Sequence, residues 1–574
     1  ALFTNSTGSQ NTAVGHSALE SATTANSNTA VGQGAGYGLT TGYACVAIGD
    51  QAMAAGNVTG NSNNCVGYQA GEQLTSGSNN CFFGAYAGEG TTTADYNIAI
   101  GQEALEENST GHSNVAIGFR ALEQNTASQN VALGRGALGA NTSGAHNTGI
   151  GDSTLNSNTT TNHNTAVGFN ALASNDTGDT NTAVGSRSLD SNTSGYANVA
   201  IGFDAMGAAT TGDRCVGIGA YALDAALTGN DNTAVGTESG SGVTSGANNT
   251  ALGSYSLRYC ATASDNTAIG KSCATNTTGA NNTAVGSIAL ANNVGGENNT
   301  AIGKSALQES TTASQNTAVG WEALAANTTG LNNTAVGKYA VKTVTTGERN
   351  TAVGVQALGS TGVAVTNNTA VGVNALYSTT ASSNTACGDA ALFANTSGTN
   401  NVAMGRNAMF EGTTGSENTA IGTYSLDAVN TGSYNTALGA YSMSANTSGG
   451  SNTALGRAAL FANLNGGSNV AIGVEALSAN TSGQYNTAVG SKALDANETV
   501  DANTAVGYRS GNSTTTGGDN TWVGYDSGEE NTTGGSNTAV GHSALREATT
   551  ASKNTALGRS AAANISTSHN VTAL

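Results

Sequence analysis

The chain has 574 residues and a formal net charge of −19, with 17 Lys and Arg against 36 Asp and Glu. This acidity argues against a nucleic-acid partner, which needs basic stripes, and against binding to an anionic membrane surface. There is no run of eighteen apolar residues, so we expect no membrane insertion either. With 80 Gly, no Pro and 9% charged residues, the composition is typical of disordered segments, yet its regular apolar columns predict a fold.

The phrase Asn-Thr-Ala-Val-Gly recurs about every 17 residues, in about 33 copies between Asn11 and Asn554. Fixed self-similarity at such a period is typical of a solenoid, in which each repeat buries its apolar side only by stacking on its neighbours. No linker, charge run or composition shift interrupts the repeat. We therefore expect one continuous domain over residues 1–574, although length alone suggests about four domains.

A well-formed copy runs from Asn164 to Thr180 and reads NTAVGFNALASNDTGDT. With its first Asn as position 1, the phrase at positions 1 to 5 and the Ala-Leu pair at positions 8 and 9 predict two short strands per coil. Only about five residues separate the Gly at position 5 from the next corner, which is too short for a stable helix. The expected fold is an all-β parallel β-solenoid of about 33 coils, which at ~4.8 Å per coil makes an elongated rod on the order of 160 Å long.

Strand alternation places positions 2 and 4 on one face and position 3 on the other. Position 4 is apolar in every copy, so we expect it to point into the core, with the Leu at position 9 as a second core column. The Thr hydroxyls at position 2 would then share that face and bond to neighbouring rungs. Position 3 is almost always small, which favours either a subunit interface or a solvent-facing column, although Phe82 and Trp522 break the pattern.

Two further columns have expected structural roles. The Asn at position 1 would stack rung on rung and pass amide hydrogen bonds along the column. The Gly at position 5 would adopt a positive φ or occupy a corner too tight for a Cβ. In three representative copies the expected structural residues are Asn11, Val14, Gly15, Asn164, Val167, Gly168, Leu172, Asn486, Val489, Gly490 and Leu494.

Few residues are candidates for chemistry. His146 and His163 both occupy position 17 of successive coils, which predicts imidazoles within about 5 Å of one another. Two His make a weak metal site without a third ligand, for which Asp152 is the nearest candidate in sequence. The acidic pairs Glu106-Glu107 and Glu529-Glu530 are expected to be solvated. We therefore expect no metal, no cofactor and no enzyme activity.

The Cys residues and the glycosylation motifs are also expected to have no catalytic role. Cys residues in adjacent coils occupy different columns, which predicts free and mostly buried thiols for all seven because a disulfide needs closely spaced Cβ atoms. They are Cys45, Cys65, Cys81, Cys215, Cys260, Cys273 and Cys387. Asn-X-Ser/Thr motifs recur at corners, for example at Asn141, Asn175 and Asn192, and would accept a glycan in a eukaryotic secretory setting.

The phrase [NS]-[TV]-A-[VI]-G, as at Asn114–Gly118 and Asn198–Gly202, resembles the repeats in the heads of trimeric autotransporter adhesins, the YadA-like left-handed parallel β-roll. Over its whole length the chain is also similar to the NTAVG-rich shafts of phage and viral tail-fibre proteins. These resemblances imply a homotrimeric fibre located outside the cell, at the cell surface or on a virion.

The leading functional hypothesis is a structural extracellular fibre or filament subunit with a role in surface display or adhesion. Its partner would be the chain itself, as a homotrimer or head to tail because both ends fall in mid-coil, with Asn570–Leu574 assigned to positions 1 to 5. A cell-surface receptor or a glycan is a further expected partner, with Tyr68, Tyr86, Trp321 and Tyr525 as scattered aromatic residues that could contact it.

Two other classes of function were considered. The first is an ice-binding solenoid, which the abundant Thr suggests; the inward orientation expected for position 2 argues against it. The second is a carbohydrate-active β-helix enzyme, which would need several coils to depart together from the consensus, and no such cluster occurs.

Overall fold

A computed structural model describes all residues from 1 to 574. The protein is all-β, with 34 strands and no helix, and so has no helical segment that could cross a membrane. It divides into two compact units, Ala1–Asn282 and Thr283–Leu574, which are described separately below. The predicted parallel β-solenoid, with about 33 turns of about 17 residues, is confirmed, whereas the single domain over 1–574 stays a prediction.

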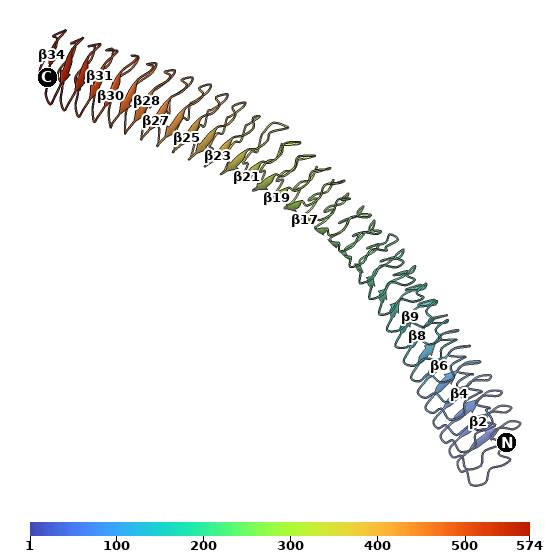
Figure 1. The fold of residues 1–574 in the computed structure, drawn as a ribbon. Coiled ribbons are helices and arrows are strands. Elements are labelled where there is room, and N and C mark those ends of the chain that lie inside the picture. The colour runs from blue at the N-terminus through green and yellow to red at the C-terminus, as the bar shows by residue number, and fades with distance from the viewer. The chain divides into compact units, whose positions relative to one another are not determined.

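Unit 1 stacks one three-residue strand per coil, and each strand pairs in parallel with the strand of the next coil (Figure 1). Its strands are β1 (Thr12–Val14), β2 (Thr29–Val31), β3 (Val46–Ile48), β4 (Asn64–Val66), β5 (Cys81–Phe83), β6 (Ile98–Ile100), β7 (Val115–Ile117), β8 (Val131–Leu133), β9 (Thr148–Ile150), β10 (Thr165–Val167), β11 (Thr182–Val184), β12 (Val199–Ile201), β13 (Val216–Ile218), β14 (Thr233–Val235), β15 (Thr250–Leu252) and β16 (Thr267–Ile269).

Unit 2 has the same construction. Its strands are β17 (Thr283–Val285), β18 (Thr300–Ile302), β19 (Thr317–Val319), β20 (Thr334–Val336), β21 (Thr351–Val353), β22 (Thr369–Val371), β23 (Thr385–Cys387), β24 (Val402–Met404), β25 (Thr419–Ile421), β26 (Thr436–Leu438), β27 (Thr453–Leu455), β28 (Val470–Ile472), β29 (Thr487–Val489), β30 (Thr504–Val506), β31 (Thr521–Val523), β32 (Thr538–Val540), β33 (Thr555–Leu557) and β34 (Thr572–Ala573). Strand β34 pairs Thr572 with Thr555, so the last residues are one position out of the predicted register and Leu574 occupies position 4.

The prediction of a second strand in each coil is wrong. The Ala-Leu segment is a turn, because its residues alternate between ordinary and left-handed backbone conformations. In the coil that starts at Asn164, φ is +52° at Asn170, +54° at Leu172 and +59° at Thr180. Left-handed residues without a glycine are energetically costly and cannot continue a pleated ladder. Each coil therefore has one strand and a long, tightly turned return path.

The facing of the strand is the reverse of the prediction. From β2 to β33 the middle residue is buried in every strand, whereas the first and third residues are buried in none. Ala166 is fully buried, whereas Thr165 and Val167 on either side of it are only half-buried. Val489 is half-buried in the same way. Val14 is 58% exposed. The expectation that Val14, Val167 and Val489 point into the core is thus wrong, as are both expectations for position 3.

The interior of each coil is narrow, which explains this reversal. It holds the Ala of position 3 and the Ala-Leu pair of positions 8 and 9, exemplified by Ala166, Ala171 and Leu172, all fully buried. The predicted core roles of Leu172 and Leu494 are therefore confirmed. A Val or Ile on the inner face would collide with this Leu column, because interiors are packed closely enough that one extra methylene is felt.

Phe82 and Trp522 are the two exceptions to a small residue at position 3, and both are fully buried inside the solenoid. Each replaces the missing Leu side chains of two coils. A Cβ added to Gly71 or Gly88 at position 9 would lie 2.9 or 2.7 Å from the Phe82 ring. Glycines occupy position 9 around Trp522 in the same way, at Gly511 and Gly528. Positions 3 and 9 therefore face one another across the core.

The Gly at position 5 is required for two reasons, as predicted. Its φ is +137° at Gly15, +138° at Gly168 and +140° at Gly490, a conformation that L side chains rarely adopt. A Cβ on Gly168 would also lie 2.4 Å from the carbonyl oxygen of Gly185 in the next coil. Any larger residue would push neighbouring coils apart at this corner.

The predicted Asn column at position 1 is confirmed as a buried ladder. Asn164 is fully buried, and its Oδ1 accepts the backbone N–H of Asn181 at 2.8 Å. Its Nδ2 donates to the carbonyl of Gly178 at 3.1 Å. Asn11 and Asn486 make the equivalent bonds in their own coils. One side chain must both donate and accept here, which explains why the position selects Asn.

Candidate functional site

The outer face of the sheet carries the most regular array of side chains in each unit. It is formed by the residues at positions 2 and 4, which are the first and last residues of the strands and flank the inward Ala. In unit 2 every strand from β17 to β33 begins with Thr except β24 and β28, which begin with Val402 and Val470. We call the surface formed by positions 2 and 4 of β17–β33 the Thr–aliphatic face.

The Thr hydroxyls of this face have no protein partner. Thr317 and Thr334 are half-buried, and some of their equivalents at position 2, such as the Thr of β21, are exposed. None of them makes a side-chain hydrogen bond, so the predicted bonds between neighbouring rungs are wrong. The Thr residues at position 13 behave differently. The Thr311 hydroxyl donates to the carbonyl of Thr328 at 3.0 Å, and the Thr328 hydroxyl donates to that of Thr345 at 3.0 Å. The hydroxyl groups at position 2 are therefore available to solvent or to a ligand.

Position 4 adds an exposed aliphatic column beside these hydroxyls. Most of its residues in unit 2 are Val, Ile or Leu, and the exceptions are Cys387 and Met404. Exposed fractions of 40% at Ile302, 38% at Val353 and 41% at Leu438 show that the column is open. Positions 2 and 4 of β17–β33 contain no charged residue. Contiguous exposed apolar surface is uncommon on soluble proteins and marks interaction sites.

The register of the face is unaffected by changes in coil length. The coil that starts at Asn350 is one residue longer than the repeat and the next is one residue shorter. Even so, β21 pairs Thr351 with Thr369 and β22 pairs Thr369 with Thr385. The extra and missing residues are accommodated in the return path, so Thr stays above Thr and aliphatic residue above aliphatic residue.

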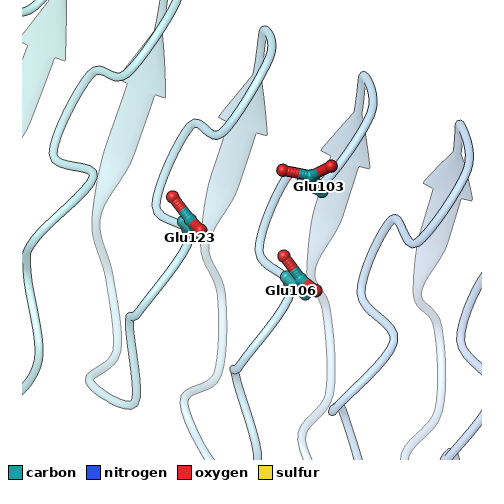
Figure 2. A group of neighbouring side chains, drawn as sticks. All are labelled: Glu103, Glu106 and Glu123. Atoms are coloured by element: carbon teal, nitrogen blue, oxygen red, sulfur yellow. The ribbon is translucent and has the colours of Figure 1, made fainter.

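A cluster of carboxylates in unit 1 is the densest group of titratable side chains. Glu103 and Glu106 belong to one coil and Glu123 to the next (Figure 2), and their carboxylate oxygens lie within 4.8 Å of one another. Arg120 lies beside them, with its Nε 2.5 Å from Glu103 and 3.8 Å from Glu123. Because Glu103 and Glu123 already share the single positive charge of Arg120, we assign no metal to the cluster.

The pKa values within this cluster diverge. The hydrogen bond from Arg120 lowers the pKa of Glu103 below its ordinary 4.5. Burial raises the pKa of Glu106, and the neighbouring charges of Glu103, Glu89 and Glu123 raise it further. Glu89, one coil earlier in the same column, also has a raised pKa, through burial and the proximity of Glu72. The column is a row of like charges along one face of unit 1, which Arg120 offsets only in part.

The predicted proximity of His146 and His163 is confirmed. Their rings are stacked, with centroids 4.9 Å apart and planes 12° from parallel. The proposed third ligand is engaged elsewhere, because Asp152 accepts a hydrogen bond from Arg135 at 2.8 Å. The pair therefore makes a surface contact between neighbouring coils and brings no third ligand with it.

The second acidic pair behaves differently from the prediction. Glu529 is only 3% exposed, and it forms ion pairs with Arg509 and Arg546. Its burial is accompanied by two cations, as expected for an ionised group inside a protein. Only Glu530 is exposed as predicted. The sequence does not predict these two ion pairs, because Arg509, Glu529 and Arg546 come from three different coils.

The Asn-X-Ser/Thr motifs at Asn141, Asn175 and Asn192 are closed to glycosylation in the folded chain. All three Asn are fully buried. Their Nδ2 groups donate along a second internal ladder, for example from Asn192 to the Oδ1 of Asn175 at 2.8 Å. In the folded chain these three Asn therefore have a structural role.

The prediction of free and mostly buried thiols is confirmed for six Cys residues. Cys45, Cys65, Cys215 and Cys260 are free and buried, and Cys81 and Cys387 are free and half-buried. Burial raises the pKa of Cys260 to about 11, so this thiol stays protonated and unreactive near neutral pH.

The exposed aromatic residues form contacts between coils. Tyr68 packs on Tyr86, Trp321 on Tyr339, and Tyr525 on Tyr508. In the stacked pair Tyr508–Tyr525 the centroids are 5.2 Å apart. Tyr525 is stacked on Tyr508 of one neighbouring coil and on His542 of the other, which argues against a glycan platform at this residue.

No family model matches this sequence, and a search of curated proteins finds no match. The candidate surfaces therefore rest on geometry alone.

Proposed function

We propose that this chain is a subunit of a structural extracellular fibre that serves surface display or adhesion, at a cell surface or on a virion. One observation carries the proposal. In both units coil follows coil with the same strand and the same corner glycine, and with a buried Asn ladder that is interrupted only at Cys45 and Cys215.

The energetics of the coils support a mechanical role. Each coil buries only a Leu and two Ala in the examples above, so it could not fold alone and depends on the coils on either side. At ~4.8 Å per coil, the 16 strands of unit 1 stack over a length on the order of 75 Å. Backbone ladders run along this direction, together with an Asn ladder that is interrupted only at Cys45 and Cys215, and both favour stiffness along the stack.

A homotrimeric tail-fibre shaft is the alternative form of the same function. The Ala column cannot serve as its subunit contact, because position 3 lies inside the solenoid. A trimer would have to use an outer column instead. A cell-surface receptor or glycan stays a proposed partner, and we propose neither a nucleic-acid partner nor a catalytic role.

Electron microscopy of the purified native chain, combined with its mass in solution, tests the proposal. We expect narrow, elongated particles, as single chains, as trimers or joined end to end. Compact globular particles would refute a fibre. The mass separates a single-chain fibre from the trimeric alternative, and the contacts seen between particle ends test head-to-tail assembly.

A further inference from the structure

We propose that the Thr–aliphatic face of unit 2 binds ice. This inference rests on the proposed adhesive fibre and names what it adheres to. The inward orientation expected for the Thr residues at position 2, which argued against ice binding, is wrong, because positions 2 and 4 both point outward. The face is the outward side of strands β17–β33, with Thr in one column and a Val, Ile or Leu in most rungs of the other.

The unpartnered hydroxyls are the first argument. The Thr hydroxyls at position 2 make no hydrogen bond within the protein, whereas those of Thr311 and Thr328 at position 13 donate to the neighbouring coil. The protein thus leaves one Thr column free while it uses another to hold the stack together. A crystalline water surface can supply both a donor and an acceptor to every hydroxyl of a free column.

The spacing is the second argument. Neighbouring rungs of a parallel sheet are ~4.8 Å apart, and residues two apart along a strand are about 6.6 Å apart. These distances are close to those at which water oxygens recur on the prism faces of hexagonal ice. The in-register pairing repeats this two-dimensional pattern from strand to strand, as in Thr317 beside Thr334 and Val319 beside Val336.

The lack of charge is the third argument. Charged side chains hold water in geometries of their own, whereas positions 2 and 4 of β17–β33 offer only hydroxyl, methyl, thiol and thioether groups. The chain has 36 Asp and Glu, yet it places none of them on this face. Water over the aliphatic column meets methyl groups and can keep its lattice arrangement.

A second copy of the chain is the competing occupant. A dry contact between two such faces would bury a row of Thr hydroxyls whose neighbouring carbonyls are already used in the sheet ladder, so each rung would have to align with a hydroxyl of the opposing face. Buried hydroxyls without partners are strongly disfavoured. Ice provides a partner at each rung, so the observations favour it over self-association at this face.

Two variants of the full chain separate these outcomes. The face variant is T300K/T317K/T334K, which places Lys at position 2 of β18, β19 and β20. The control is T312K/T329K/T346K, which adds the same charge to exposed Thr at position 14 of the same three coils. Circular dichroism and hydrogen exchange of both variants establish that the solenoid is intact.

The assays are partition of the fluorescently labelled chain into a slowly growing ice hemisphere and inhibition of ice recrystallisation, together with native mass. We expect the wild type and the control to enter the ice with the same native mass as the face variant, and the face variant to be excluded. Exclusion of the wild type from ice would overturn the inference, as would equal partition of all three proteins. A multimeric wild type that the face variant dissociates would assign the face to a second copy. Particle shape in electron microscopy is read independently, so failure to bind ice leaves the fibre proposal standing.

Discussion

Replacing Phe82 by Ala should destabilise unit 1 locally, and restoring Leu at Gly88 should reverse much of that loss. Phe82 is fully buried and occupies the space that Leu side chains fill in other coils. Truncation of a buried Phe to Ala typically costs about 3–5 kcal/mol, through lost transfer free energy and a residual cavity.

Gly88→Leu alone should also be destabilising, because the new Cβ would lie 2.7 Å from the Phe82 ring. Overpacking of this kind costs about 1–3 kcal/mol or more. The double variant Phe82→Ala/Gly88→Leu rebuilds the consensus coil, and φ at Gly88 is already +61°, close to the +54° of Leu172. We expect it to be more stable than either single variant, and the triple variant with Gly71→Leu to be closer still to wild type.

Native-state hydrogen exchange of strands β4 to β6, followed by mass spectrometry, measures these changes locally. A local measurement is needed because long repeat arrays do not unfold in a single two-state transition. In the double-mutant cycle of Phe82→Ala and Gly88→Leu, the effects of independent sites would add to within ~0.5 kcal/mol. We expect the double variant to be more stable than the sum of the single effects by well over that amount. Strictly additive effects would refute the inference that positions 3 and 9 share one space.

Three further predictions concern facing, the Asn ladder and pH. Ala488→Asp should unfold its coil, because it buries a charge, whereas Val489→Asp on the outer face should be tolerated; hydrogen exchange of β29 compares the two variants. Asn486→Ala should cost about 1–3 kcal/mol by leaving buried backbone groups unpaired, measured in the same way; an unchanged exchange rate would contradict the ladder's role. Burial and the charge of Asp204 raise the pKa of Asp224 from 3.8 to about 6. The folded state then holds this proton more tightly, so stability from this group is present below pH 3.8 and is lost as pH rises through about 6. The variant Asp224→Asn should lack this pH dependence when the melting temperature is measured as a function of pH. A profile identical to that of the wild type would contradict the role assigned to Asp224.

Much of the fold could be predicted from periodicity alone. A repeat of about 17 residues fixes the stacking, and columns such as Gly168 and Asn164 have roles that follow from backbone geometry and hydrogen-bonding capacity. The Leu column at Leu172 and Leu494 follows from its regular apolar character. These features depend on residues that recur in nearly every coil.

The facing of the strand could not be derived from alternation. Alternation determines which positions share a face, but it leaves open which face is inside. Ranking by hydrophobicity favoured Val167 over Ala166 for the interior, whereas the space beside Leu172 admits only the smaller residue. A signal was nevertheless present in the sequence, because the aromatic exceptions Phe82 and Trp522 coincide with Gly in place of Leu at position 9.

The outer face was missed for the same reason. Alternation and hydrophobicity together place Thr and Val at positions 2 and 4 in the core, so they do not predict an exposed array. Side-chain contacts between distant columns, such as Arg509 and Arg546 with Glu529, were also beyond prediction. They depend on how the return path turns, and its left-handed residues carry no strong sequence signature at positions 7 and 17.

High-resolution cryo-electron microscopy of the native chain tests the central claim most directly, because it shows both the facing of the strands and what covers them. In unit 2 we expect Ala488 density inside the solenoid, with Thr487 and Val489 outside it and open to solvent. Density for Val489 in the core, or a second chain packed over Thr487 and Val489, would contradict this account.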